Sequence, residues 1–518
     1  MRKLIYNKLI YYFIILSPII DIITSFMIKN NINLTIGIIS KMIILALSVI
    51  YLLFIDKKNR KINFMLLFIL FIFSVLNILN NTSIIDNYLF TYFSYLFKYI
   101  YHIIILLFFV RVLKEYPIKI CELRIPLLIT TVCYIIAFIT KTDFQSYAYS
   151  INKVGSSGWY SSANELGNLL CLFFPISIYN AFENKDGIKF DTVICILIGI
   201  CMLLLGTKVG LLGYFLVLIA YLVLRLIFIK HNKINKKYLI ALIMLVIPLL
   251  LLNSLPAVKN IKYVYKDSNS DINYVVNSGR DEFNNQLKEQ YNKSNEYSKI
   301  IGKIHVGNKK GEENILIIEQ DFYDILYMYG YLGIIIMVLG YLIVYLALIK
   351  KIFNYYRKHN SISKKSITIL IAVSLELLIA FISGHSLLSP SVSTYLTLFA
   401  AISINLEFKN EKDYKKKILI SNKDELYKKI NKDKYEITIL NTNNKEIDDY
   451  ETISIKKIET RSKLLNKMIA FFLVKNQKYD YVITDKKNND FENTYLLYSN
   501  ALSKLSVKDK IIKEFCKN

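Results

Sequence analysis

Four short polar segments with side chains suited to phosphate binding and proton transfer interrupt an otherwise apolar chain: Gly206–Gly210, Ser278–Asp281, Ile318–Asp324 and Ser383–Pro390. Two of them contribute the cations Lys208 and Arg280. An arginine pairs its planar guanidinium with phosphate oxygens, whereas a lysine adds a point charge. His385, Glu319 and Asp321 are groups that can accept a proton from a hydroxyl. Together these residues would hold a diphosphate and activate an attacking hydroxyl, as transfer from a lipid-linked sugar requires.

A sixth candidate, Lys98, lies in the outer half of an apolar stretch and can add to the diphosphate site. No Asp-x-Asp pair stands at a predicted outer surface to suggest a divalent metal. We therefore expect protein cations to stabilise the developing charge, with no metal and no cofactor.

Each candidate also has a structural interpretation, which the sequence leaves open. Lys208 can extend its ammonium toward water from a helix end, and Arg280 can be a solvated loop charge. His385 can have a structural role in a turn or as a helix cap. Glu319 and Asp321 can be acids in the first turn of a helix, where the helix dipole favours them.

Five charged or ionisable residues fall inside apolar stretches, where charge is costly and usually paired within the bundle. They are Asp21, Lys41, Lys98, His102 and Glu376. His305, in a polar segment, is expected to be either an ordinary loop residue or part of the site.

The elements that must position these residues are membrane-spanning helices. The chain has 518 residues, of which 54% are hydrophobic, and about 20 apolar residues make one span. The pattern predicts an all-α polytopic membrane protein with about twelve transmembrane helices, near residues 9–28, 34–55, 62–79, 90–113, 125–140, 164–182, 192–205, 209–229, 238–252, 322–349, 367–383 and 391–406.

The net charge of +25 comes mostly from Lys/Arg-rich loops that alternate with Lys-poor ones. This bias predicts a multi-pass cell-membrane protein with both termini in the cytoplasm. Nucleic-acid binding is not expected, because the basic residues stand in short runs between apolar blocks.

Two further parts complete the organisation. Within a transmembrane domain of residues 1–406, Asn253–Asp321 is a large extracytoplasmic loop with little apolar periodicity, either a functional segment or disordered. Residues 407–518 carry short strand-like runs at 417–421, 435–440, 452–455 and 479–484, with a helix-like stretch at 462–475. This tail is predicted to be a small cytosolic α/β accessory module.

The outer segments together resemble the O-antigen ligase and O-antigen polymerase family of membrane glycosyltransferases. The similar pieces are Gly158–Gly167 (GWYSSANELG), Gly206–Gly210 (GTKVG), Ser278–Arg280 (SGR), Glu319–Gly333 (EQDFYDILYMYGYLG) and Gly384–Pro390 (GHSLLSP). The resemblance implies a GT-C-like helical fold, an undecaprenyl-diphosphate-linked glycan donor, a glycan acceptor, and metal-independent transfer with inversion. It also implies that Arg280 grips the diphosphate.

The chain departs from the family pattern at two places. Lys208 stands in the turn where many members have an arginine or another cation. Glu319 and Asp321 occupy the region in which many members carry a histidine, and His385 comes later in the chain. The resemblance does not extend to the tail, which we expect to dock cytosolic glycan-assembly proteins.

Three functions are compatible with these features. The first is an enzyme that polymerises or ligates lipid-linked oligosaccharides on the outer face of the membrane for a cell-surface polysaccharide. The second is a flippase for such lipids, which would be expected to show internal repeats and short loops. The third is a membrane sensor with the tail as its output module, although the tail shows no known signalling motif.

Overall fold

The computed structural model describes residues 2–32, 35–147, 150, 152–183, 189–228, 236–267, 280–309, 312–359 and 363–405, together with strands between residues 416 and 496. The chain divides into two compact units. The first comprises Met1–Ile352 and Ser363–Leu406, and the second comprises Phe353–Ile362 and Glu407–Asn518.

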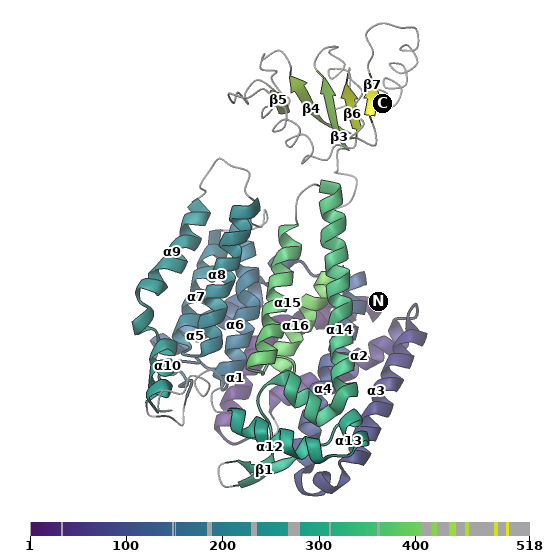
Figure 1. The fold of residues 1–518 in the computed structure, drawn as a ribbon, viewed down its shortest axis with the longest axis vertical. Helices are drawn as coiled ribbons and strands as arrows, with labels where there is room; N and C mark the ends of the chain where they lie inside the picture. Colours follow the sequence, from purple (N-terminus) through teal and green to yellow (C-terminus); the bar gives the residue numbers. More distant parts are fainter. Residues whose placement is uncertain are drawn as a thin grey trace. The chain divides into compact units, whose positions relative to one another are not determined.

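The first unit is a bundle of apolar helices (Figure 1). They are α1 (Arg2–Lys29), α2 (Ile36–Ile50), α3 (Arg60–Asn80), α4 (Thr82–Glu115), α5 (Arg124–Ile139), α6 (Ala163–Ile178), α7 (Lys189–Leu204), α8 (Lys208–Phe228), α9 (Lys236–Leu250), α14 (Asp321–His359), α15 (Lys364–Ile382) and α16 (Pro390–Asn405). Short turns of other helix types, η1 (Tyr51–Ile55), η2 (Ile120–Leu123), η3 (Tyr179–Glu183) and η4 (Leu252–Ser254), extend or join them.

Each predicted span overlaps one of these helices in the part of the chain that the structure describes. Eight helical stretches there are long and apolar enough to cross a membrane, and α7, α8 and α9 contain shorter apolar stretches. The prediction of a polytopic helical membrane protein is therefore confirmed, while the number of twelve crossings stays a prediction.

Helices α6 and α16 form the centre of the bundle, because almost all of their side chains are buried. Two hydroxyl groups of α16 are satisfied within the helix, because Thr394 and Thr397 each donate to the carbonyl four residues earlier. Peripheral helices differ, and α3 leaves Phe64, Phe68 and Phe71 exposed. An outward apolar surface of this kind fits contact with lipid.

Interior ionisable groups have polar partners, as expected. The Lys41 ammonium lies 2.8 Å from the Asp21 carboxylate, and His102 shares a hydrogen bond of 2.9 Å with Tyr341. The Glu376 carboxylate accepts a hydrogen bond from Ser386 at 2.5 Å. These contacts lower the cost of keeping ionisable side chains out of water.

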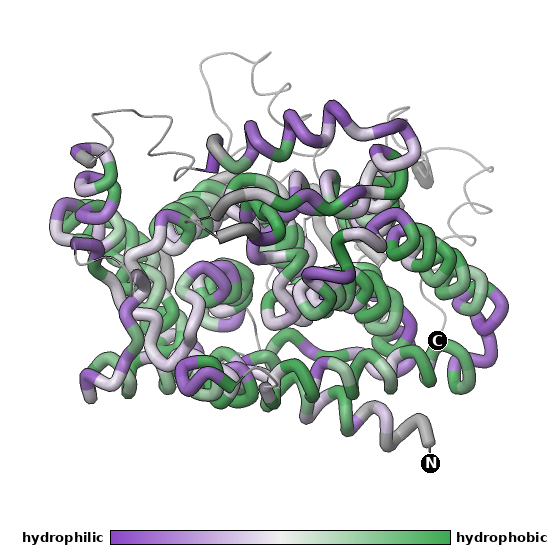
Figure 2. The backbone as a smooth tube through the Cα atoms, turned by 90° about the horizontal axis from the view of Figure 1, so that it is seen from below, coloured by the Kyte–Doolittle hydropathy of each residue, from purple (hydrophilic) through white to green (hydrophobic). Residues whose placement is uncertain are grey.

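The described parts of the segment 253–320, namely residues 253–267, 280–309 and 312–320, contain more regular structure than the sequence pattern indicates. They contain α10 (Pro256–Asp267), α12 (Arg280–Lys293), α13 (Glu296–Ile301) and an antiparallel hairpin of β1 (Val306–Lys309) and β2 (Glu312–Ile315). All lie at one end of the bundle (Figure 1), which we call the loop end. Viewed from there, hydrophilic stretches cross in front of the hydrophobic helices (Figure 2).

Side chains from distant helices hold this segment in place, which explains why periodicity could not reveal its order. The Asn77 amide donates to the carbonyls of Ile301 and Met328. Asn81 accepts a hydrogen bond from the Ile304 amide at 2.8 Å.

Besides the last residues of α14, the described part of the second unit is a parallel five-stranded sheet in the order β5-β4-β3-β6-β7. The strands are β3 (Lys416–Ser421), β4 (Tyr435–Asn441), β5 (Glu451–Ser454), β6 (Tyr481–Thr484) and β7 (Thr494–Leu496). Strands β3 to β6 correspond to the four predicted runs. The predicted helix at residues 462–475 lies outside the described residues.

Candidate active site

Glu319 is the centre of a small charged cluster at the loop end. One oxygen of its carboxylate, Oε2, lies 3.6 Å from the Arg280 guanidinium and 3.6 Å from Nε2 of His385. The Glu319 side chain is 41% exposed, whereas Arg280 is 14% and His385 28% exposed. The structure therefore brings together three of the residues that the sequence nominated, from the segment before α14, the start of α12 and the turn between α15 and α16.

The backbone at this cluster adopts an uncommon conformation. Glu319 and His385 both have positive φ, 66° and 62° respectively, which costs free energy for residues with a Cβ. Gly384 has φ 66°, and a Cβ there would lie 2.4 Å from the Glu319 carbonyl oxygen. The two turns thus touch backbone to backbone, and such left-handed positions often accompany functional sites.

Asp321 anchors one of the two turns. Its buried carboxylate accepts the backbone N–H groups of His385 at 3.0 Å, Ser386 at 2.7 Å and Leu387 at 2.6 Å. It begins α14, so the structural alternative noted for this acid has a physical basis.

Asp324, one helical turn later, anchors the other. Its carboxylate accepts the N–H groups of Ile318, Glu319 and Gln320 at 2.8–3.2 Å. The first turn of α14 thus fixes both turns of the site, one acid for each.

A buried polar network holds the turn between α15 and α16 that carries His385. Asn168 of α6 donates to the Gly384 carbonyl at 2.7 Å and to the Ser386 hydroxyl at 3.1 Å. Ser386 donates in turn to Glu376 of α15. The turn is therefore tied to α6, α14 and α15, and the position of His385 is defined by all three.

The two loop-end histidines have opposite electrostatic environments. Burial opposes protonation of His385, but the contact with Glu319 and the charges of Glu165 and Asp321 outweigh it, so the pKa of His385 lies above its usual value. Burial lowers the pKa of His305 to about 4, helped by the nearby Lys303 ammonium. His305 is therefore neutral near pH 7, whereas the surroundings of His385 favour its protonated form more than water does.

Further cations accompany Arg280. Lys208, the first residue of α8, is repelled electrostatically by Arg280 and by Lys153, which places the three charges in one region. Asn260 of α10 holds this region by donating to the carbonyls of Gly206 and Val154 at 2.9 and 2.6 Å. Gathering like charges costs free energy that a bound anion recovers.

Lys98, on α4, has other electrostatic neighbours than Lys208. Its main electrostatic partners are Glu165, Asp321 and Lys41, and its ammonium lies 4.8 Å from the ring centroid of Tyr95.

Two residues that sequence reasoning did not single out join the site, namely Glu165 in the first turn of α6 and Lys153 before it. The signal for Glu165 was its place within the motif Gly158–Gly167, three residues after the capping residue Ser162. Nothing in the local sequence marked Lys153.

A model of the family described as O-antigen ligase like membrane protein matches residues 3–269 and 262–411. The chain belongs to this family. The match covers the membrane unit and its loop end, where the Glu319 cluster lies, and it ends before strand β3. Searches of curated proteins and of solved structures gave no significant match to the chain.

Membership in the O-antigen ligase-like family places the protein in cell-surface polysaccharide biosynthesis, with a glycosyltransferase-like enzymatic role. The resemblance that the outer motifs suggested is therefore confirmed.

Proposed function

We propose that the protein polymerises or ligates undecaprenyl-diphosphate-linked oligosaccharides on the outer face of the cytoplasmic membrane. One observation carries this proposal. At the loop end, a partly exposed Glu319 carboxylate contacts both the Arg280 guanidinium and the His385 imidazole. A group that can accept a proton thus stands beside a cation that can bind phosphate.

The donor diphosphate binds at the cationic side of the cluster. Arg280 pairs with phosphate oxygens, and Lys208 and Lys153 add charge to the same region. Because these cations relieve their mutual repulsion by binding an anion, they can supply the positive charge for a metal-independent transfer. Lys98, which interacts mainly with Glu165 and Asp321, contributes from the other side of the site.

In the transfer step, the acceptor hydroxyl oxygen attacks the anomeric carbon of the donor from the side opposite the diphosphate. The bond from this carbon to the phosphate oxygen breaks, and the lipid diphosphate leaves with the bonding electron pair. The hydroxyl proton moves to Glu319. Arg280 stabilises the negative charge that develops on the leaving oxygen, and His385 can donate a hydrogen bond to it.

Asp321 acts in this scheme by holding the His385 turn through its three amide contacts. The proton acceptor is Glu319, whose side chain is more exposed than that of Asp321. The two acids therefore have different tasks although they are two residues apart.

The Lys/Arg bias of the loops supports an orientation with the loop end outside and both termini in the cytoplasm. A cysteine placed at Glu289, an exposed position of α12, tests it in an otherwise cysteine-free chain. We expect labelling by an impermeant thiol reagent in intact cells. Labelling only after lysis would reverse the orientation.

The function is tested by removing the protein and sizing the surface glycan. Single repeat units would identify a polymerase, and full-length chains left unattached would identify a ligase. Expression of the Arg280→Ala variant in cells that lack the protein should fail to restore the product. Expression of Lys293→Ala, which removes an exposed cation on the same helix, should restore it. Lipid-linked units trapped on the inner leaflet would instead identify a flippase.

A further inference from the structure

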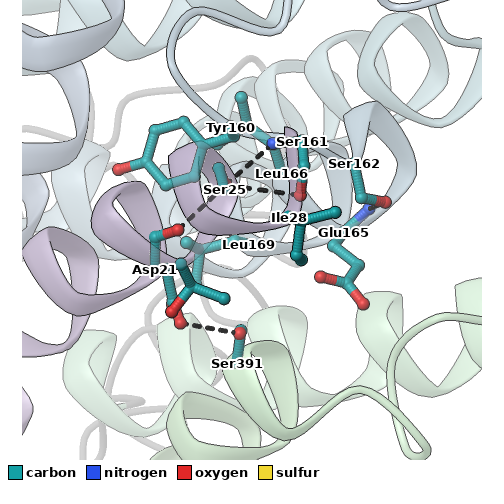
Figure 3. A pocket seen from close by; sticks show the side chains of 11 residues that line it. Asp21, Ser25, Ile28, Tyr160, Ser161, Ser162, Glu165, Leu166, Leu169 and Ser391 are labelled. Carbon is teal, nitrogen blue, oxygen red and sulfur yellow. Dashed lines mark hydrogen bonds between the residues drawn. The ribbon is translucent and has the colours of Figure 1, made fainter. Parts of the chain in front are cut away.

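A small pocket of about 70 Å³ with a mixed polar and apolar lining opens between α1, α6 and α16 (Figure 3). It lies beside the last two turns of α1 and the first turns of α6 and α16. The α6 side reaches the proposed active site, because Glu165 in the pocket wall interacts electrostatically with His385 and with Lys98.

Hydroxyl and carboxyl groups dominate the polar part of the lining. It includes Asp21, Ser25, Ser161, Ser162, Glu165 and Ser391. Among the described residues that line the pocket there is no lysine, arginine or histidine. A phosphate would find no cation in this wall, whereas sugar hydroxyls can both donate to the carboxylates and exchange hydrogen bonds with the serines.

One side of the pocket is fixed by internal bonds. The Lys41 ammonium binds Asp21 at 2.8 Å and Ser391 at 2.7 Å, and Ser391 donates to Asp21 at 2.9 Å. The Asp21 charge is therefore balanced by a buried cation. Ser25 likewise accepts the N–H of Ser161 at 2.9 Å.

Glu165 is different, and it faces the pocket from the other side (Figure 3). No side-chain hydrogen bond or ion pair ties its carboxylate to another residue in the described ranges, and its backbone N–H donates to the Ser162 hydroxyl at 3.3 Å. A carboxylate in a polar pocket without such a bond keeps its acceptor capacity for a ligand. Its negative charge also disfavours a second anion.

We infer that this pocket binds a neutral, hydroxyl-bearing sugar of the acceptor glycan, with Glu165 accepting hydrogen bonds from its hydroxyls. The inference rests on the proposed function and extends it. The cations around Arg280 take the donor diphosphate, and the Glu165 pocket takes the acceptor. A sugar held there would contact Glu165, whose charge acts on His385, so the sugar is bound on the side of the pocket that interacts with the proposed active site. Uronic acids are excluded from the pocket by charge.

Binding can be measured without any transfer reaction. The full chain in lipid nanodiscs is mixed with the methyl glycosides of glucose, galactose and N-acetylglucosamine, and with methyl glucuronoside, and saturation transfer to the sugar protons is recorded by NMR. We expect transfer to at least one neutral glycoside and none to the glucuronoside. Glu165→Gln should reduce the signal about tenfold, the factor expected when hydrogen bonds to a charged acceptor are lost.

Two variants separate binding from folding. Glu289→Gln removes an exposed, surface-paired carboxylate and should leave the signal unchanged. Ile28→Trp adds bulk to a partly exposed position of the pocket wall and should abolish the signal while the thermal unfolding midpoint is retained.

Three results would overturn the inference: absence of transfer to every neutral glycoside, equal transfer to the glucuronoside, or an unchanged signal in both pocket variants. None of these would affect the transferase proposal, which depends on the glycan product of Arg280→Ala. Conversely, normal product from the Arg280→Ala variant would contradict the transferase proposal, but the binding data would remain valid.

Discussion

Glu319 and His385 stand 66 residues apart in the sequence, yet their side chains lie 3.6 Å apart and both hold left-handed backbone conformations. Hydrogen bonds to other residues hold both conformations. Asp324 binds the amide of Glu319, and Asp321 binds the amide of His385. The first turn of α14 therefore sets the distance between the proposed proton acceptor and its cationic neighbour.

Replacing Glu319 with glutamine should suppress glycan formation. The amide keeps the size of the side chain but cannot accept the acceptor proton, and a positioned general base contributes about 10²–10⁴-fold in rate. The measurement is the rate of glycan elongation or attachment in isolated membranes. Glu296→Gln, which changes an exposed glutamate of α13, is the matched control. An active Glu319→Gln enzyme would assign the base to another residue.

Replacing Asp321 with alanine should destabilise the protein. Three amides would lose their acceptor, at about 1–3 kcal/mol for each buried group left unsatisfied. Asp321→Asn retains one acceptor oxygen and should be less damaging. Thermal unfolding in detergent measures both variants against Asp86→Asn, an exposed acid of α4. Equal unfolding midpoints for all three would show that Asp321 does not anchor the His385 turn.

The ion pair of His385 predicts a loss of stability toward alkaline pH. The pKa of His385 is raised in the folded protein, so its contribution is complete below the unfolded pKa of about 6.5 and is lost as pH rises through the folded pKa. The difference in unfolding midpoint between the native chain and His385→Gln should therefore shrink as pH rises. A difference that grows with pH would contradict the assigned charge.

His305 should show the opposite dependence. Its folded pKa is lowered to about 4, so the folded state favours the neutral ring. This contribution is complete above about pH 6.5 and is lost as pH falls toward 4. Acid titration of the unfolding midpoint should give a shallower decline for His305→Gln than for the native chain. Parallel curves would show that His305 is not buried as a neutral ring.

The sequence alone was sufficient to predict that the first unit is a bundle of apolar helices, but not the helices and hairpin between residues 253 and 320. Apolar blocks of about 20 residues predicted the helices, because lipid offers no hydrogen-bond partner and each span must satisfy its own backbone. The strand-like runs of the tail were predictable as well. Arg280, Glu319 and His385 could be nominated because charged residues interrupting apolar blocks are conspicuous.

Tertiary structure decided what each polar residue does. Glu319 and Asp321 are equivalent in the sequence pattern, but only the fold shows that Asp321 faces the amides of the 383–389 turn while Glu319 faces Arg280 and His385. Likewise, only the fold shows that Glu165 and Lys153 interact with residues of the site. The physical reason is that the free energy of a charge depends on its nearest polar neighbours. Here those neighbours come from helices far apart in the chain, which no local pattern records.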